Sequence, residues 1–76
     1  MSRLKKISGK ECVKILCNKF GFSIKRQKGS HIILIKIVDG GKVGTVVPNH
    51  KELKIGTLKG LLELGKVDEE EFSKYL

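Results

Sequence analysis

Aromatic residues are scarce in this chain, and tryptophan is absent. Three Phe and one Tyr are its only aromatic residues. Proteins that bind single-stranded nucleic acid by base stacking need exposed aromatic rings. We expect Phe20, Phe22 and Phe72 to lie in the core, so a stacking-based binder is disfavoured.

Long apolar runs are also lacking. The longest unbroken run, from Ile32 to Ile35, is far shorter than the roughly 20 residues of a transmembrane helix. The basic N-terminal segment, Met1 to Lys6, leads into no apolar stretch and does not resemble a secretory signal. We therefore expect a cytoplasmic protein that has no membrane partner.

Cysteine is rare as well, with only Cys12 and Cys17 present. Both fall in a predicted helix, where side chains five residues apart diverge by about 140°. Such a pair cannot form a disulfide or bind one metal ion together. We expect two reduced thiols in or near the core.

Acidic residues are almost absent from the first half of the chain. Residues 1–38 contain ten Lys/Arg and only one acid, Glu11, for a net charge of +9, whereas residues 39–76 have a net charge of −1. Concentrated positive charge attracts polyanions such as nucleic acid, or an acidic protein, although lysine can also serve solubility alone. A metal-dependent nuclease needs clustered carboxylates, so we expect no metal site.

The length of 76 residues predicts a single domain, 1–76, that has two packed layers and no room for an enclosed cofactor. Ser8 and Glu11 match a helix capping box at the start of an apolar stripe over residues 8–20, which Gly21 can end. Thr57 is the predicted N-cap of a second helix over 57–64. Asp68 is the predicted N-cap of a third helix over 69–75.

Between the first two helices the pattern predicts three strands. Residues 22–27 alternate, with Phe22 and Ile24 on one side, and residues 31–38 are rich in β-branched side chains. The Asp39–Lys42 turn leads to a third strand over 43–47. The expected fold is α+β, in the order α-β-β-β-α, with three antiparallel strands and helices on one face. Both faces of the strand over 31–38 are apolar apart from His31 and Lys36. This pattern favours a partner that covers the spare face, although β-propensity together with partial cover from the C-terminal segment would also explain it.

Histidines are the side chains that titrate near neutrality. His31 follows a Gly29–Ser30 turn, and Lys25, Arg26 and Lys28 precede it. An acid/base residue beside cations suits attack of a 2′-hydroxyl on its own phosphodiester. Three interpretations of His50, which follows Pro48-Asn49, stay open: a second acid/base, a phosphate contact, or a solvated loop residue without a role.

Four pieces of the sequence together resemble the HicA family of mRNA-interferase toxins. They are the segment Phe20 to His31, which matches GF-x-x-x-R-Q-x-GSH, then Val47-Pro48-x-His50, Glu52-Leu53-x-x-Gly56-Thr57-Leu58, and Glu70-Glu71-Phe72. The resemblance implies a double-stranded-RNA-binding-like fold and a metal-independent endoribonuclease without cofactors. It also implies that His31 is catalytic, that mRNA is the substrate, and that a HicB-like antitoxin is the partner.

Three functions are compatible with the residues themselves. The first is a ribonuclease toxin in which His31 is the general acid/base. Its RNA-binding residues would be Lys25, Arg26, Lys28, Gly29, Ser30 and His50. The second is a small RNA-binding module without chemistry, and the third is an interaction protein whose basic face binds an acidic partner.

Overall fold

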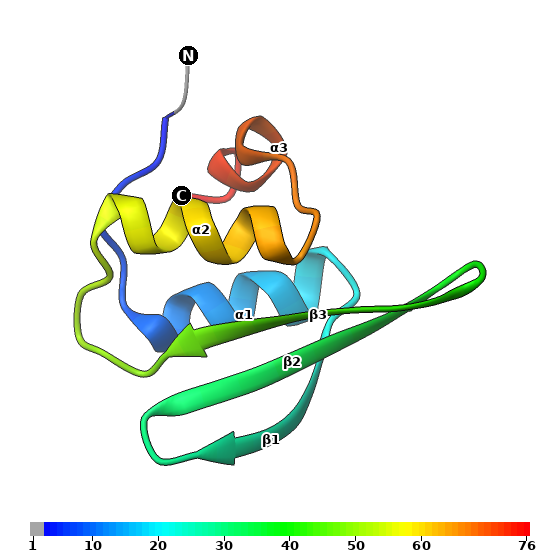
Figure 1. The fold of residues 1–76 in the computed structure, drawn as a ribbon. Coiled ribbons are helices and arrows are strands. Elements are labelled where there is room, and N and C mark those ends of the chain that lie inside the picture. The colour runs from blue at the N-terminus through cyan, green and yellow to red at the C-terminus, as the bar shows by residue number, and fades with distance from the viewer. Residues whose placement is uncertain (1–2) are drawn as a thin grey trace.

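The structure is a computed structural model that describes residues 3–76, so the first two residues of the basic N-terminal segment lie outside the described part. The elements in chain order are α1 (Gly9–Lys19), β1 (Ser23–Lys28), β2 (His31–Val38), β3 (Gly41–Pro48), α2 (Ile55–Leu64) and α3 (Glu69–Ser73) (Figure 1). The predicted α-β-β-β-α order is confirmed, followed by the short third helix. Within residues 3–76, no helix is long and apolar enough to cross a bilayer.

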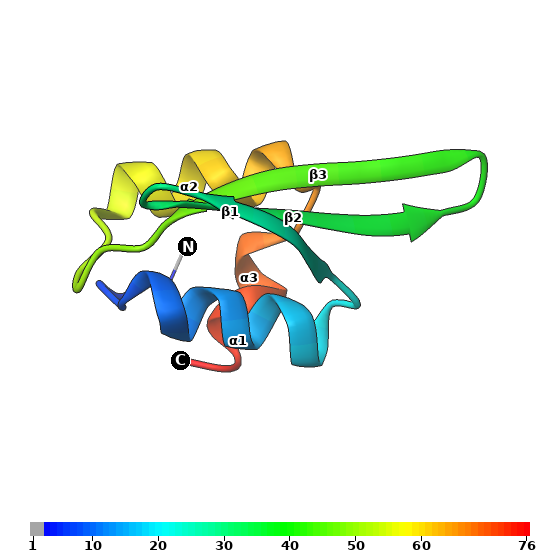
Figure 2. The ribbon, with the colours of Figure 1, turned by 90° about the horizontal axis from the view of Figure 1, so that it is seen from below.

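The three strands form one antiparallel sheet in the order β1-β2-β3. Figure 2 shows α1 and α3 on one side of this sheet, while α2 runs beside β3. We call the face toward α1 and α3 the inner face and the opposite face the outer face. The prediction of an antiparallel sheet with helices packed against it is therefore confirmed.

The inner face and the helices share one hydrophobic core. Ile32 and Leu34 of β2 and Val47 of β3 are buried there. The core also takes in residues from all three helices and their connections: Ile7, Cys12, Val13, Ile15, Leu16, Phe22, Leu53, Leu58, Leu61, Leu62 and Phe72. Thr45 is the buried polar residue of β3, and its hydroxyl donates to the carbonyl of Leu61 at 2.6 Å. This bond satisfies the hydroxyl and attaches α2 to the sheet.

Helix α1 follows its sequence signals closely. The Ser8 hydroxyl accepts from the backbone N–H of Glu11 at 3.0 Å, and Gly21 has a φ of 78° just beyond the helix. Cys12 is buried and Cys17 is half-buried, and both thiols are free, as expected. Burial raises the pKa of the Cys12 thiol to about 12, so this thiol stays protonated and unreactive near neutral pH.

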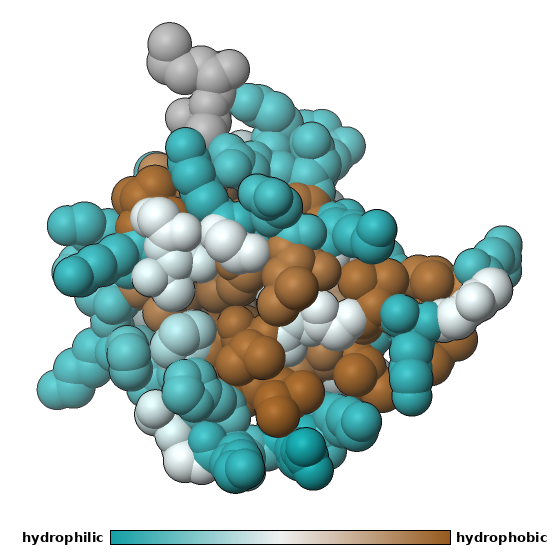
Figure 3. All heavy atoms as spheres, in the orientation of Figure 1, coloured by the Kyte–Doolittle hydropathy of each residue, from teal (hydrophilic) through white to brown (hydrophobic). Residues whose placement is uncertain are grey.

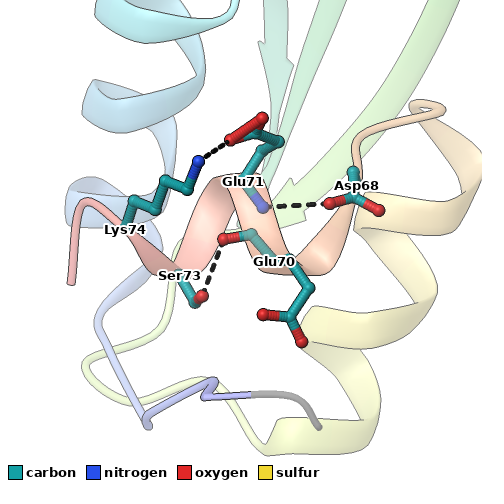
Figure 4. A network of polar contacts seen from close by, with 5 residues as sticks. All are labelled: Asp68, Glu70, Glu71, Ser73 and Lys74. Carbon is teal, nitrogen blue, oxygen red and sulfur yellow. Dashed lines mark hydrogen bonds and ion pairs between the residues drawn. The ribbon is translucent and has the colours of Figure 1, made fainter.

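Helix α3 has a network of polar contacts at its surface (Figure 4). The Asp68 carboxylate accepts from the backbone N–H of Glu71 at 3.0 Å, which confirms Asp68 as the N-cap. The Ser73 hydroxyl donates to the carbonyl of Glu70 at 2.8 Å, and the Lys74 ammonium lies 2.7 Å from the Glu71 carboxylate. These acids therefore stabilise the start of a short helix.

Several details of the sequence-based prediction are wrong. Ile24 does not share the burial of Phe22. It is 56% exposed, because β1 is an edge strand whose register shifts between Ile24 and Arg26. Thr57 is not the N-cap of α2. The helix begins at Ile55 after Lys54, whose carbonyl accepts from the N–H of Leu58 at 2.9 Å. Helix α3 ends at Ser73 rather than at residue 75.

Gly9 allows α1 to begin directly against the segment that leaves β3. It is buried, and its N–H donates to the carbonyl of His50 at 2.8 Å. A Cβ at residue 9 would collide with the carbonyl oxygen of Pro48. The first turn of α1 and the end of β3 are thus held backbone to backbone, which only glycine permits here.

We expect Gly9→Ala to lower the free energy of unfolding by about 1–3 kcal/mol, the usual cost of overpacking a tight site. Gly60→Ala is the matched control. Gly60 lies inside α2 with nothing within 4 Å of a Cβ, so alanine there should stabilise by about 1 kcal/mol through helix propensity. Urea unfolding of both variants measures the two effects. Equal changes in both variants would contradict the close approach at Gly9.

Candidate active site

One end of the sheet gathers most of the residues that the sequence singled out. There the Gly29–Ser30 turn meets the segment that leaves β3, because the N–H of Asn49 donates to the carbonyl of Ser30 at 2.5 Å. We call this region, residues 29–31 and 48–50, the histidine end. Its backbone is also joined to α1 by the bond from Gly9 to His50. Three segments far apart in sequence are therefore held together by main-chain bonds.

His31 lies at the start of β2 with its side chain exposed. Its neighbours in the ladder are Lys28 of β1 and Pro48 of β3. Directly paired residues share a face of the sheet, and the buried side chains of Ile32 and Leu34 define the inner one, so His31 belongs to the outer face. Solvent-borne ligands can therefore reach its imidazole.

The basic residues of β1 are divided by the shift in register. All six residues of β1 are exposed. Lys28 pairs with His31 and Arg26 pairs with Ile33, so both cations share the outer face with His31. Lys25 falls within the register shift, so pairing assigns it to neither face. Arg26 and Lys28 are thus the predicted RNA contacts that the fold brings to His31.

Gly29 and Ser30 form the turn between these two strands. Gly29 has a φ of 62°, a left-handed conformation that favours glycine, and the side-chain amide of Gln27 donates to its carbonyl at 3.1 Å. A Cβ on Gly29 would meet nothing within 4 Å. The glycine therefore serves the turn conformation, and the space beside it is open to a bulky ligand.

His50 is exposed and lines two shallow grooves at the histidine end. One groove lies against the start of α1 and the other against the start of α2. The first is lined by Ser8, Lys10, Asn49, His50 and Lys51, and the second by Pro48, His50, Glu52, Leu53, Lys54 and Thr57. Sequence reasoning identified His50 but missed Lys10 and Lys51 as its neighbours. Lys10 lies 40 positions away from His50 along the chain, and no sequence signal connects the two. The close approach of Gly9 to Pro48 in the fold brings them together.

The rest of the outer face is apolar. Ile33 and Ile35 are half-buried, and Ile37 is 73% exposed near the tip of the β2–β3 hairpin, which extends past the helices in Figure 1. Val46 pairs with Ile33 and belongs to the same face. Figure 3 shows apolar side chains gathered across the front of the molecule, with hydrophilic groups around them. The face that carries His31 thus combines a basic end with an exposed apolar area.

The phenylalanine side chains lie in or against the core rather than at the histidine end. Phe72 and Phe22 are buried, and Phe20 stacks on Phe72 with ring centroids 6.0 Å apart, as a core role predicts. Within the described range 3–76, no three His, Cys, Asp or Glu side chains come together in a way that could hold a metal ion.

Comparison with known families tests the resemblance that the sequence showed. A model of the HicA toxin of bacterial toxin–antitoxin systems matches residues 9–65, which is three quarters of the chain. The chain belongs to the HicA toxin family. No curated protein and no solved structure gives a significant match.

The HicA match covers the whole histidine end and the basic strand β1, and it leaves out α3. Toxins of the HicA family are ribonucleases, and a toxin of this kind implies a cognate antitoxin. RNA is therefore the ligand against which the outer face is to be tested.

We expect Arg26→Gln and Lys28→Gln each to weaken RNA binding and to reduce the slope of log K against log salt by roughly one unit or less, because each removes about one phosphate contact. The Lys66→Gln control changes an exposed lysine in the near-neutral half and should leave the slope unchanged. Filter binding on an unrelated RNA sequence should show the same loss. Equal effects at Lys28 and Lys66 would mean that the outer face is not the RNA footprint.

Proposed function

We infer that this HicA toxin is an endoribonuclease that cleaves mRNA in the cytoplasm, with His31 as general acid/base. The observation that carries this proposal is the exposed imidazole of His31 on the same face as Arg26 and Lys28. A phosphodiester laid across these cations would bring its reacting oxygens to the imidazole. The cations would then stabilise the charge that develops on the phosphorane.

The proposed substrate contacts extend from the cations to the turn. Arg26, Lys28 and Lys25 bind phosphates, while the open space beside Gly29 lets the backbone of Gly29–Ser30 approach one closely. His50 contacts RNA from the neighbouring segment. The proposal assigns no metal and no cofactor to the reaction. The amino-acid composition supports this, because a metal site needs clustered carboxylates and Glu11 is the only acid of residues 1–38.

A non-catalytic RNA-binding module is the alternative, and His31 distinguishes the two. His31→Ala should slow cleavage of RNA by about 10²–10⁴-fold, the usual contribution of a general acid/base, and should abolish growth arrest on induced expression. The exposed side chain makes no core contact, so the variant should keep the wild-type circular dichroism and unfolding midpoint.

The control for this experiment is RNA binding. His31→Ala should retain binding within a few-fold of wild type, because Arg26 and Lys28 remain. Cleavage by wild type should persist in excess EDTA. An alanine variant that cleaves as fast as wild type would leave the binding module as the better description. Loss of cleavage on chelation, restored by Mg²⁺, would refute the metal-independent mechanism.

We further infer that a HicB-like antitoxin covers the outer face and hides His31 from RNA. Ile37 is 73% exposed and shares the outer face with the half-buried Ile33, Ile35 and Val46, and partner proteins commonly bury a contiguous apolar area of this kind. An acidic surface on the antitoxin would complement the net charge of +9 in residues 1–38 and speed association. The toxin would then be inactive in the complex by steric masking.

Substitution of Ile37 tests this docking. Ile37→Ser should weaken antitoxin binding by about tenfold or more, as truncation of a buried interface residue does. The matched control is Ile24→Ser, because Ile24 is 56% exposed but pairs with Leu34 on the inner side. Calorimetric titration of each variant with separately purified antitoxin compares the two affinities. Equal affinities for both variants, or a complex that cleaves RNA as fast as the free toxin, would contradict masking at the outer face.

A further inference from the structure

The backbone of a second histidine, His50, lies two residues past the strand partner of His31, although the two histidines are far apart in sequence. His31 pairs with Pro48 in the ladder, and the bond from the Asn49 N–H to the Ser30 carbonyl extends this pairing one residue past β3. His50 is the next residue, and its carbonyl accepts from Gly9 at 2.8 Å. Its backbone is therefore fixed from the sheet on one side and from α1 on the other.

The side chain of His50 is exposed where the two grooves of the histidine end meet, since it lines both. The charged groups that line these grooves with it are Lys10 from α1 and Lys51, Glu52 and Lys54 from the segment before α2. Lys28 faces His31 from β1. Most of these groups are cations, so an RNA backbone that passes His31 would be attracted onward into the grooves beside His50.

The chemistry of RNA cleavage needs two proton transfers. The 2′-hydroxyl must lose a proton as its oxygen bonds to phosphorus, and the 5′-oxygen must gain one as its bond to phosphorus breaks. One imidazole cannot be neutral for the first transfer and charged for the second in the same step. In such a step His31 therefore performs one of the two transfers, and water or another side chain performs the other.

We propose that His50 is the second proton-transfer residue of this site, acting with His31 on the same phosphodiester. This inference rests on the proposed ribonuclease function. The neutral imidazole of one histidine takes the proton of the 2′-hydroxyl, and the imidazolium of the other gives its proton to the leaving 5′-oxygen. The products are a 2′,3′-cyclic phosphate and a free 5′-hydroxyl, and no atom or electron is left unbalanced.

The test is the pH dependence of kcat/KM for a defined RNA between about pH 5 and pH 9, where histidines titrate. Wild type should give a bell-shaped profile, the acidic limb from the base and the alkaline limb from the acid. His50→Ala and His50→Gln should each lose about 10²-fold or more in rate and should lose one limb. Their fold should survive, because the bond from Gly9 uses the backbone carbonyl of residue 50. Asn18→Ala, at an exposed position of α1, is the control with an unchanged profile.

An RNA analogue that has sulfur in place of the leaving 5′-oxygen assigns the role, since a thiolate leaves without a proton. If the alkaline limb is lost and this analogue restores the rate, His50 is the general acid. If the acidic limb is lost and the analogue does not restore the rate, His50 is the base. Either result supports the proposal.

Three results would overturn the proposal. They are a rate within about threefold of wild type, a lowered profile that keeps both limbs, and a change in KM alone. The last two would reduce His50 to an RNA contact or a structural residue. Failure of the ribonuclease proposal itself is recognised separately, because wild type would then leave the RNA intact, or His31→Ala would cleave it as fast as wild type.

Discussion

The structure depends on one close approach of backbone to backbone, between the start of α1 and the segment that leaves β3. The Gly9 N–H bonds to the carbonyl of His50 at 2.8 Å, and the Leu53 N–H bonds to the carbonyl of Ile7 at 2.7 Å. These two bonds tie the chain on either side of the capping residue Ser8 to the connection between β3 and α2. The core can then close over the inner face, while the chain around His50 is held beside the start of β2.

The two faces of the sheet have separate roles because the helices cover only one of them. The inner face supplies stability through side chains such as Leu34 and Val47, which are fully buried. The outer face is left to carry His31, Arg26, Lys28 and an exposed apolar area. Under the proposed function, RNA uses the basic end and the antitoxin uses the whole face. One ligand would therefore exclude the other without any conformational change in the toxin.

Four of the seven acidic residues of the second half, Asp68 to Glu71, lie away from the histidine end, whereas Glu52 lines a groove there. Asp68 and the three glutamates that follow it cap and begin α3, which Figure 1 places away from the end where β3 finishes. Helix α3 lies beyond the HicA match and contributes Phe72 to the core. Helix α3 therefore completes the core through Phe72, and the acidic residues of its first turn stabilise its own N-terminus.

The sequence by itself determined the elements, the family and the histidine that we propose as catalytic. Capping at Ser8, alternation in β2 and the glycine turns are local signals, so they predict local structure well, and the piece ending in Gly29-Ser30-His31 indicated the family. The sequence could not determine the burial of Ile24, because this depends on a register shift in β1. Nor could it determine the start of α2, which depends on tertiary contacts. Only the tertiary structure placed Arg26 and Lys28, but not Lys25, on the face of His31, and brought Lys10 and His50 to the same end. Strand register and the contact at Gly9 join residues that lie far apart along the chain, and no local pattern records such pairings.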